Sequence, residues 1–146
     1  MYNNPWIYNN KEFNSDDIPE DICGFIYIIT NKINGKKYIG KKIFVSTTRK
    51  KVKNKTRRKV TKKESDWKSY YGSSPSLSLD IEHFGKDNFE RKILRLCKSK
   101  SELGYFEAKE QFIQGCLEHD GFYNEHIMCR VRKANLKFYP SPSLEK

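Results

Sequence analysis

The feature that most constrains the fold is a pair of β-forming segments joined by an Asn-Gly turn. After Gly24, residues 25–30 (FIYIIT) are all β-branched or aromatic, which predicts a buried strand. Asn34 and Gly35 follow, and both residue types tolerate positive φ, the strongest short-range signal for a hairpin. Residues 36–40 (KKYIG) supply the returning strand. We therefore expect an antiparallel hairpin whose first strand is centrally placed in a sheet.

The rest of the chain predicts one further strand and two helices. Apolar residues after Pro75 predict a short helix that ends at Gly85, and residues 88–97 (NFERKILRLC) predict a third strand. A second helix of about 17 residues should begin at Ser101, with an apolar stripe formed by Leu103, Phe106, Phe112, Ile113 and Leu117. This order of elements in 146 residues predicts a single α+β domain, in which helices flank a small three-stranded mixed or antiparallel sheet.

By composition the chain divides into an arm, a domain and a tail. Residues 1–20 are mostly polar and predict an arm that lies over the domain, residues 21–130 form the expected domain, and residues 131–146 form a tail. Within the domain, residues 41–63 carry 12 Lys or Arg and no acid. Like charges repel, so this insertion predicts a mobile basic loop or a partly helical excursion.

The charge balance indicates the class of partner. Twenty-nine Lys plus Arg against 18 Asp plus Glu give a net charge of +11 and a sequence pI of about 9.5. A protein this basic most often meets a polyanion, although a solvated basic surface or a ribosome-type structural role fits the charge as well. The sequence has no long apolar run, which predicts no membrane association and a cytoplasmic location.

Cysteine and histidine spacing argues against a zinc cluster. Cys23, Cys97, Cys116 and Cys129 are widely separated, without the close ligand pairs that zinc requires. We expect them to be buried free thiols. The three histidines are equally scattered and fit surface or core positions better than metal ligation.

Two tyrosines on the predicted hairpin carry a resemblance to a known family. Tyr27 and Tyr38 stand eleven positions apart around the Asn-Gly turn, and Tyr38-Ile39-Gly40 is a YIG triplet. The pattern resembles the signature of the GIY-YIG nuclease superfamily, although Phe25 occupies the usual first glycine position. The ordered set continues with Ser73-Ser74, Phe84-Gly85, Glu107 and Tyr123-Asn124. Over residues 5–125 the chain resembles, in particular, the seg-type homing-like endonucleases of T-even-like phages.

The resemblance implies a DNA endonuclease that hydrolyses phosphodiester bonds with Mg²⁺, or with Mn²⁺ in its place. In the family one tyrosine deprotonates the attacking water, a role implied for Tyr27, and Tyr38 would position the water or the phosphate. A dense cationic surround would favour the tyrosine phenolate. The implied metal ligand is Glu107, with Glu110 one helical turn later as the alternative. Asn124 would fix the backbone of the site.

The position of the catalytic arginine is left open. Arg49 stands eleven residues after Tyr38 and fits the family spacing by count, whereas Arg57 or Arg58 fits a longer excursion. Lys41 directly follows the YIG strand and should lie near the site in any register.

Phosphate contact is the expected role of the basic segment, with a solvated charge run as the alternative. Such contacts position a protein on DNA without specifying sequence. The residues concerned are Lys42, Lys50, Lys51, Lys53, Lys55, Arg57, Arg58, Lys59, Lys62 and Lys63.

One departure from the family pattern concerns proton transfer. The usual histidine or tyrosine four residues beyond the arginine is replaced by Lys53, and Tyr70 and Tyr71 are candidates for its role. A second hypothesis is therefore a basic nucleic-acid-binding module that kept the fold and lost catalysis, and a third is an interaction protein without a nucleic-acid role. The sequence leaves open whether the protein is a monomer or a weak dimer, and whether it nicks or breaks both strands.

Overall fold

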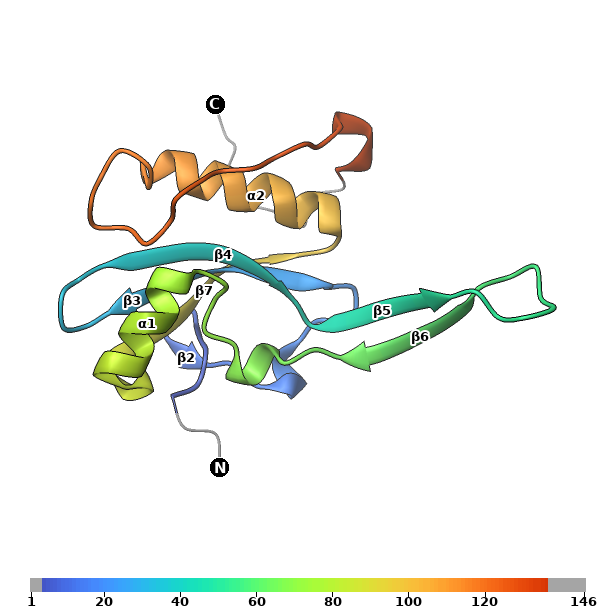
Figure 1. The fold of residues 1–146 in the computed structure, drawn as a ribbon, viewed down its shortest axis with the longest axis horizontal. Helices are drawn as coiled ribbons and strands as arrows, with labels where there is room; N and C mark the ends of the chain where they lie inside the picture. Colours follow the sequence, from blue (N-terminus) through green and yellow to red (C-terminus); the bar gives the residue numbers. More distant parts are fainter. Residues whose placement is uncertain (1–3, 137–146) are drawn as a thin grey trace.

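The computed structural model describes residues 4–136 (Figure 1). One helix lies across one face of the main sheet, a second helix and the N-terminal segment lie on the other face, and a two-stranded ribbon projects from the body. Within the described range, no helix has the length and apolar character needed to cross a membrane. Parts of the expected arm and tail, residues 1–3 and 137–146, lie outside the described residues.

The main sheet has five strands in the order β2-β1-β7-β3-β4. The expected hairpin forms one side of this sheet, where β3 (Gly24–Asn31) pairs antiparallel with the edge strand β4 (Lys37–Ile43). On the other side of β3 lies β7 (Phe89–Cys97), also antiparallel. The N-terminal segment adds β1 (Ile7–Tyr8), parallel to β7, and β2 (Lys11–Glu12). The predicted α+β domain is confirmed, with two short strands added to the three predicted ones.

Both helices begin at a serine whose side chain accepts a backbone hydrogen bond. Ser74 caps α1 (Pro75–Phe84), which ends at Gly85 in the left-handed region (φ 89°), as the sequence predicts. Ser99 caps α2 (Lys100–Ile113). Four short 3₁₀ helices complete the described elements: η1 (Ser15–Asp17), η2 (Trp67–Ser69), η3 (Lys86–Asn88) and η4 (Lys133–Asn135).

Each face of the sheet carries its own core, because side chains alternate along a strand. One face holds an aromatic cluster that includes Trp6, Phe13, Phe25, Tyr27, Phe44, Trp67 and Phe89. The face under α2 is mainly aliphatic and includes Ile26, Ile28, Ile39, Leu103 and Phe106. The expected arm therefore supplies two core residues, Trp6 and Phe13, which are 0% and 2% exposed.

The predicted extent of the second helix is wrong. It ends at Ile113, after 14 residues, and the chain turns at Gly115 (φ 61°). The apolar stripe is consequently confined to the first part of the helix, whereas Phe112, Ile113 and Leu117 are 68%, 67% and 51% exposed.

The prediction for the basic segment is also wrong. Instead of a mobile loop or a partly helical excursion, β5 (Val45–Lys50) and β6 (Lys59–Glu64) form a separate antiparallel hairpin. This β5–β6 hairpin is the ribbon that projects from the body in Figure 1. β-Branched valines and threonines occupy five of its strand positions and favour extended backbone despite the charge between them.

The cysteines are free thiols, as expected. Cys97 and Cys116 are buried, and burial raises the pKa of Cys97 to about 12. Cys129 is exposed, so the expectation of burial is wrong for that residue.

Candidate active site

The two tyrosines of the hairpin lie side by side on neighbouring strands. Tyr27 on β3 is paired with Gly40 on β4, and the ring centroids of Tyr27 and Tyr38 lie 6.2 Å apart. An ideal Cβ built at Gly40 would overlap the Tyr27 hydroxyl and lie 2.7 Å from Tyr27 Cζ. The glycine of the YIG triplet therefore provides the space that the end of the Tyr27 ring occupies.

Tyr27 is buried among aromatic rings rather than surrounded by cations. Its side chain is 1% exposed, and its ring meets those of Trp6 and Tyr70 at 5.2 and 5.9 Å. Burial, followed by the neighbouring Tyr70 and Tyr38, raises the pKa of Tyr27 well above its ordinary value. The expected cationic surround that would favour its phenolate is therefore a wrong prediction.

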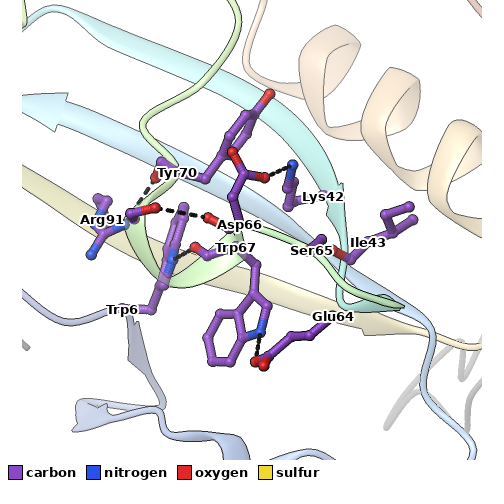
Figure 2. Close-up of polar contacts among 10 residues, drawn as sticks. Trp6, Lys42, Ile43, Glu64, Ser65, Asp66, Trp67, Tyr70 and Arg91 are labelled. Atoms are coloured by element: carbon purple, nitrogen blue, oxygen red, sulfur yellow. Dashed lines mark hydrogen bonds and ion pairs between the residues drawn. The ribbon is translucent and has the colours of Figure 1, made fainter. Parts of the chain in front are cut away.

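A buried arginine holds the segment that carries Tyr70 (Figure 2). The guanidinium of Arg91 donates to the carbonyl oxygens of Lys68 and Tyr70 at 2.9 Å each. It also lies over the rings of Trp6 and Tyr71, at 4.6 and 4.2 Å from their centroids. Through these contacts β7 fixes the backbone on both sides of Ser69, and with it the ring that touches Tyr27.

Lys42 lies beside the same tyrosine, on the outer side of the cluster (Figure 2). Its ammonium sits 4.0 Å from the centroid of the Tyr70 ring and 2.6 Å from Asp66 Oδ1. The hydrogen bond from Lys42 is the largest influence that lowers the pKa of Asp66. Of the ten expected DNA-contacting residues, Lys42 is half-buried and already paired, whereas the other nine are exposed.

A cavity of about 200 Å³ opens where β4, α2 and the segment after α2 meet. The Tyr38 hydroxyl lies 3.2 Å from Ser73 Oγ at this cavity. Residues from four separate parts of the chain line it, including Tyr38, Ser73, Glu107, Gln111, Asn124 and His126. The structure therefore brings together three of the sequence-predicted residues, Tyr38, Glu107 and Asn124.

The two candidate metal ligands on α2 face different surroundings. Glu107 lines the cavity with Tyr38, its side chain is 17% exposed, and Lys41 Nζ lies 3.7 Å from its Oε1. Burial raises the pKa of Glu107, and the nearby Lys41 and His126 partly oppose that rise. Glu110 lines a different cavity, beside Arg95, and accepts a hydrogen bond from Gln114 at 2.7 Å.

Asn124 occupies the free edge of β4 much as another strand would. Its side-chain oxygen accepts from the backbone N–H of Ile39 at 3.0 Å, and its nitrogen donates to the Ile39 carbonyl at 2.8 Å. Gln111 donates to the same carbonyl at 3.0 Å. The backbone between Tyr38 and Gly40 is thus held from outside the sheet, a geometry that suits the expected role of Asn124.

The oxygen atoms at this cavity suit a lightly held hard cation. Mg²⁺ commonly takes one or two carboxylates from a protein and keeps several waters. Glu107 supplies one carboxylate, and Gln111 Oε1 is buried without a hydrogen-bond partner among the described residues. Residues 4–136 contain no cluster of three or more His, Cys, Asp or Glu side chains. The donor set therefore fits Mg²⁺ or Mn²⁺ better than a zinc cage.

The candidate arginines lie away from the cavity. Arg49 is an exposed residue of β5, and Arg57 and Arg58 precede β6 on the same projecting hairpin. Lys41, at the end of the YIG strand, is the basic residue that contacts Glu107.

Three residues at or beneath the site carry no clear signal in the sequence. Arg91 lies at a core position of β7 between Phe89 and Ile93, where an apolar residue would be expected. Gln111 is one helical turn after Glu107, a spacing that could have drawn attention to it. His126 follows Asn124 by two residues and is brought to the cavity by the segment after α2.

Comparisons with known proteins identify a family and a relative of the chain. Residues 6–127 match the sequence model of a family described as "Putative endonuclease segE, GIY-YIG domain". The chain is also 32% identical over 100 residues to "Putative endonuclease segE" of Enterobacteria phage T4. That alignment covers 68% of this chain but 39% of the relative, so the chain spans about two fifths of the relative's length. No solved structure matches the chain.

Proposed function

Because this chain belongs to the GIY-YIG endonuclease family, we propose that it is a metal-dependent DNA endonuclease of the homing-like or DNA-processing kind. The observation that carries the proposal is the shared cavity of Tyr38 and Glu107 beside the edge of β4. Phosphodiester hydrolysis needs an activated water and positive charge near the phosphate. A tyrosine, a carboxylate and Lys41 at one opening provide side chains suited to both tasks.

Glu107 is the proposed metal ligand, because it shares the cavity with Tyr38, whereas Glu110 lines a different one. A bound Mg²⁺ would offset the charge that develops on the phosphate and lower the pKa of a water. The orphaned oxygen of Gln111 is placed to accept a hydrogen bond on the same side of α2. Lys41 favours the charged carboxylate that a cation requires.

The geometry assigns different surroundings to the two tyrosines. Tyr38 lines the cavity, so we propose that its hydroxyl contacts the water or the scissile phosphate. The role of Tyr27 as the base stays a prediction from the family. Burial raises the pKa of Tyr27 well above its ordinary value, so its hydroxyl is protonated at neutral pH. Tyr27 supports Tyr38 and Tyr70 through ring contacts whether or not it transfers a proton.

We propose that the basic residues have different roles according to where they lie. Lys41 contacts the proposed metal ligand, Glu107, whereas Arg49 lies on the projecting hairpin. Arg49 could take part in catalysis only if the bound DNA extended from the hairpin to the cavity. The other nine exposed Lys and Arg residues of the hairpin are proposed to contact phosphates.

Supercoiled plasmid incubated with the protein and Mg²⁺ tests the proposal. We expect nicked or linear DNA with Mg²⁺ and none with EDTA. Tyr27→Phe and Tyr38→Phe each remove one oxygen, and the variant that loses cleavage while keeping DNA affinity identifies the tyrosine that acts on the reaction. Salt-sensitive binding without any cleavage would instead select the inactive nucleic-acid-binding module. Neither cleavage nor binding would contradict both nucleic-acid hypotheses.

A further inference from the structure

The β5–β6 hairpin is a two-stranded ribbon that projects from the body, and its strands pair with no other strand of the described chain. Nearly every residue of both strands is exposed. The segment between Lys41 and Lys63 carries 12 basic residues and no acid, so its charge complements DNA along its whole length. The major groove of B-DNA, about 12 Å wide, admits a two-stranded ribbon. A polyanionic duplex is therefore the partner that this surface fits.

The two faces of the ribbon differ in chemistry. Residues paired across the hairpin share a face, and successive pairs alternate between the two faces. One face, here the hydroxyl face, carries only hydroxyl groups and lysines: Ser46, Thr48, Lys50, Lys59, Thr61 and Lys63. The opposite face carries Val45, Thr47, Arg49, Val60, Lys62 and Glu64. Glu64 on this second face accepts a hydrogen bond from Trp67 and pairs with Lys68, which ties the face to the body.

The base of the ribbon is fixed to the core on both strands. Phe44 is 2% exposed and packs against Trp67, with ring centroids 5.1 Å apart. Ser65 donates its backbone N–H to the Phe44 carbonyl at 2.9 Å and its hydroxyl to the Ile43 carbonyl. The ribbon therefore leaves the body in a set direction, close to the end of the strand that carries Tyr38.

From these observations we infer that the hydroxyl face of the β5–β6 hairpin enters the DNA major groove and contacts base edges. The inference rests on the proposed nuclease function and adds sequence preference to it. Ser and Thr hydroxyls can donate to or accept from any base edge, and the lysines on the same face can contact guanine or phosphate. Thr48 and Thr61, directly opposite each other at the middle of the ribbon, are the proposed centre of this contact.

The connection to the cavity limits how far the contacted bases lie from the cut. Ten residues separate Tyr38 from Thr48, which span at most about 35 Å when extended. That length corresponds to about ten base pairs of duplex, at roughly 3.4 Å per pair. A base preference set by the ribbon should therefore fall within about one helical turn of the cleaved bond.

Thr→Val substitutions test the inference, because they remove a hydroxyl while preserving charge, shape and preference for the strand. The test pair is Thr48→Val with Thr61→Val, and the matched control is Thr47→Val, one residue away on the opposite face. Duplexes with randomised positions are incubated with each protein, and both the bound and the cleaved fractions are sequenced. The wild type should favour particular bases by about fivefold or more at one or more positions near the cut.

The double variant should lose that preference while its average affinity and its salt dependence stay within about twofold of the wild type. Thr47→Val should keep the preference. The inference is overturned if the wild type shows no preference, if the double variant retains it, or if Thr47→Val loses it equally. The bound fraction gives the result even if no cleavage occurs, so failure of the nuclease proposal and failure of this inference remain distinguishable.

Discussion

Two hairpins follow each other in the chain with the same antiparallel pairing and opposite environments. In the β3–β4 hairpin, seven of the eight residues of β3 are buried. In the β5–β6 hairpin, all six residues of β6 are exposed. Packed rings and backbone contacts fix the side chains of the first hairpin, whereas the second offers its side chains to solvent. The same local geometry thus forms a scaffold in one place and an exposed basic surface, which we propose contacts DNA, in the other.

The difference arises from what each strand can bury. Alternating apolar residues on both faces of β3 let it support two cores, one on each side of the sheet. An isolated two-stranded hairpin is marginally stable in water. The β5–β6 hairpin has no apolar face, so its order depends on the anchor at Phe44 and Ser65.

The largest effect should come from Glu107→Gln, which leaves both hairpins intact and removes the carboxylate that would hold the metal. We expect Mg²⁺-dependent cleavage to fall by about 10²–10³-fold, the range for removal of one electrostatic group in an active site. DNA affinity measured in EDTA should not change. Glu110→Gln is the control, and a larger loss of cleavage in that variant would transfer the metal site to Glu110.

Arg91→Met tests whether the first hairpin depends on the packing beneath it. The substitution leaves the Lys68 and Tyr70 carbonyls without their donor, which should lower the free energy of unfolding by about 3 kcal/mol. Urea denaturation measures the loss. Lys92→Met, at the next position of β7, should change stability by less than about 0.5 kcal/mol. Equal losses in the two variants would contradict a specific role for the Arg91 guanidinium.

Gly40→Ala probes the close contact between the two strands of the first hairpin. The added methyl group would overlap the Tyr27 hydroxyl, so we expect a loss of about 2 kcal/mol in unfolding free energy, typical of overpacking. Gly121→Ala is the matched control, since an added Cβ there would have no neighbour within 4 Å. If Gly40→Ala is as stable as the control, the account of the YIG glycine is wrong.

Neutralising the second hairpin should affect binding rather than stability. With Lys50, Lys51, Arg57 and Arg58 all changed to Gln, we expect DNA affinity to fall by about 10³-fold at about 0.1 M salt. The slope of log K against log salt should become shallower by about 3. Fluorescence anisotropy at several salt concentrations measures both quantities. An unchanged slope would show that this hairpin does not contact phosphate.

The smallest effect concerns pH and returns to Glu107. Burial raises its pKa in the folded state, so the charged carboxylate destabilises the fold at neutral pH. That cost is fully present above the folded-state pKa and vanishes below the unfolded-state pKa of about 4.3. In EDTA, Glu107→Gln should therefore melt slightly higher than the wild type at pH 7, with the difference closing as the pH falls below about 4. A lower melting temperature at pH 7 would contradict a net cost of burial.

The sequence predicted those parts of the molecule whose cause is local. The FIYIIT run, the Asn-Gly turn and Gly85 each act through their neighbours, so the first hairpin, the third strand and the end of α1 follow from the sequence. The tyrosine spacing likewise identified the family. The aromatic surroundings of Tyr27 and the core position of Arg91 depend on contacts between distant segments, such as Trp6 with Trp67, and were not predictable.

The prediction for the basic segment was wrong for a different reason. Charge density dominates its composition and argues for a mobile chain, whereas its threonines and valines favour strands. The contacts of Phe44 with Ser65 and Trp67 favour a hairpin, because they hold the two strands side by side where they leave the core. No periodic pattern in the sequence shows that anchor.

The central claim is that residues beside the β3–β4 hairpin carry out cleavage and the β5–β6 hairpin contacts DNA. It is tested most directly by measuring binding and single-turnover cleavage on the same duplex. Glu107→Gln should keep the wild-type Kd and lose cleavage, whereas the four-site hairpin variant should bind more weakly and cleave at close to the wild-type rate once saturated. If neutralising the hairpin abolishes cleavage at saturation, or if Glu107→Gln loses binding instead of cleavage, the division between a reacting site beside the β3–β4 hairpin and a contacting β5–β6 hairpin is wrong.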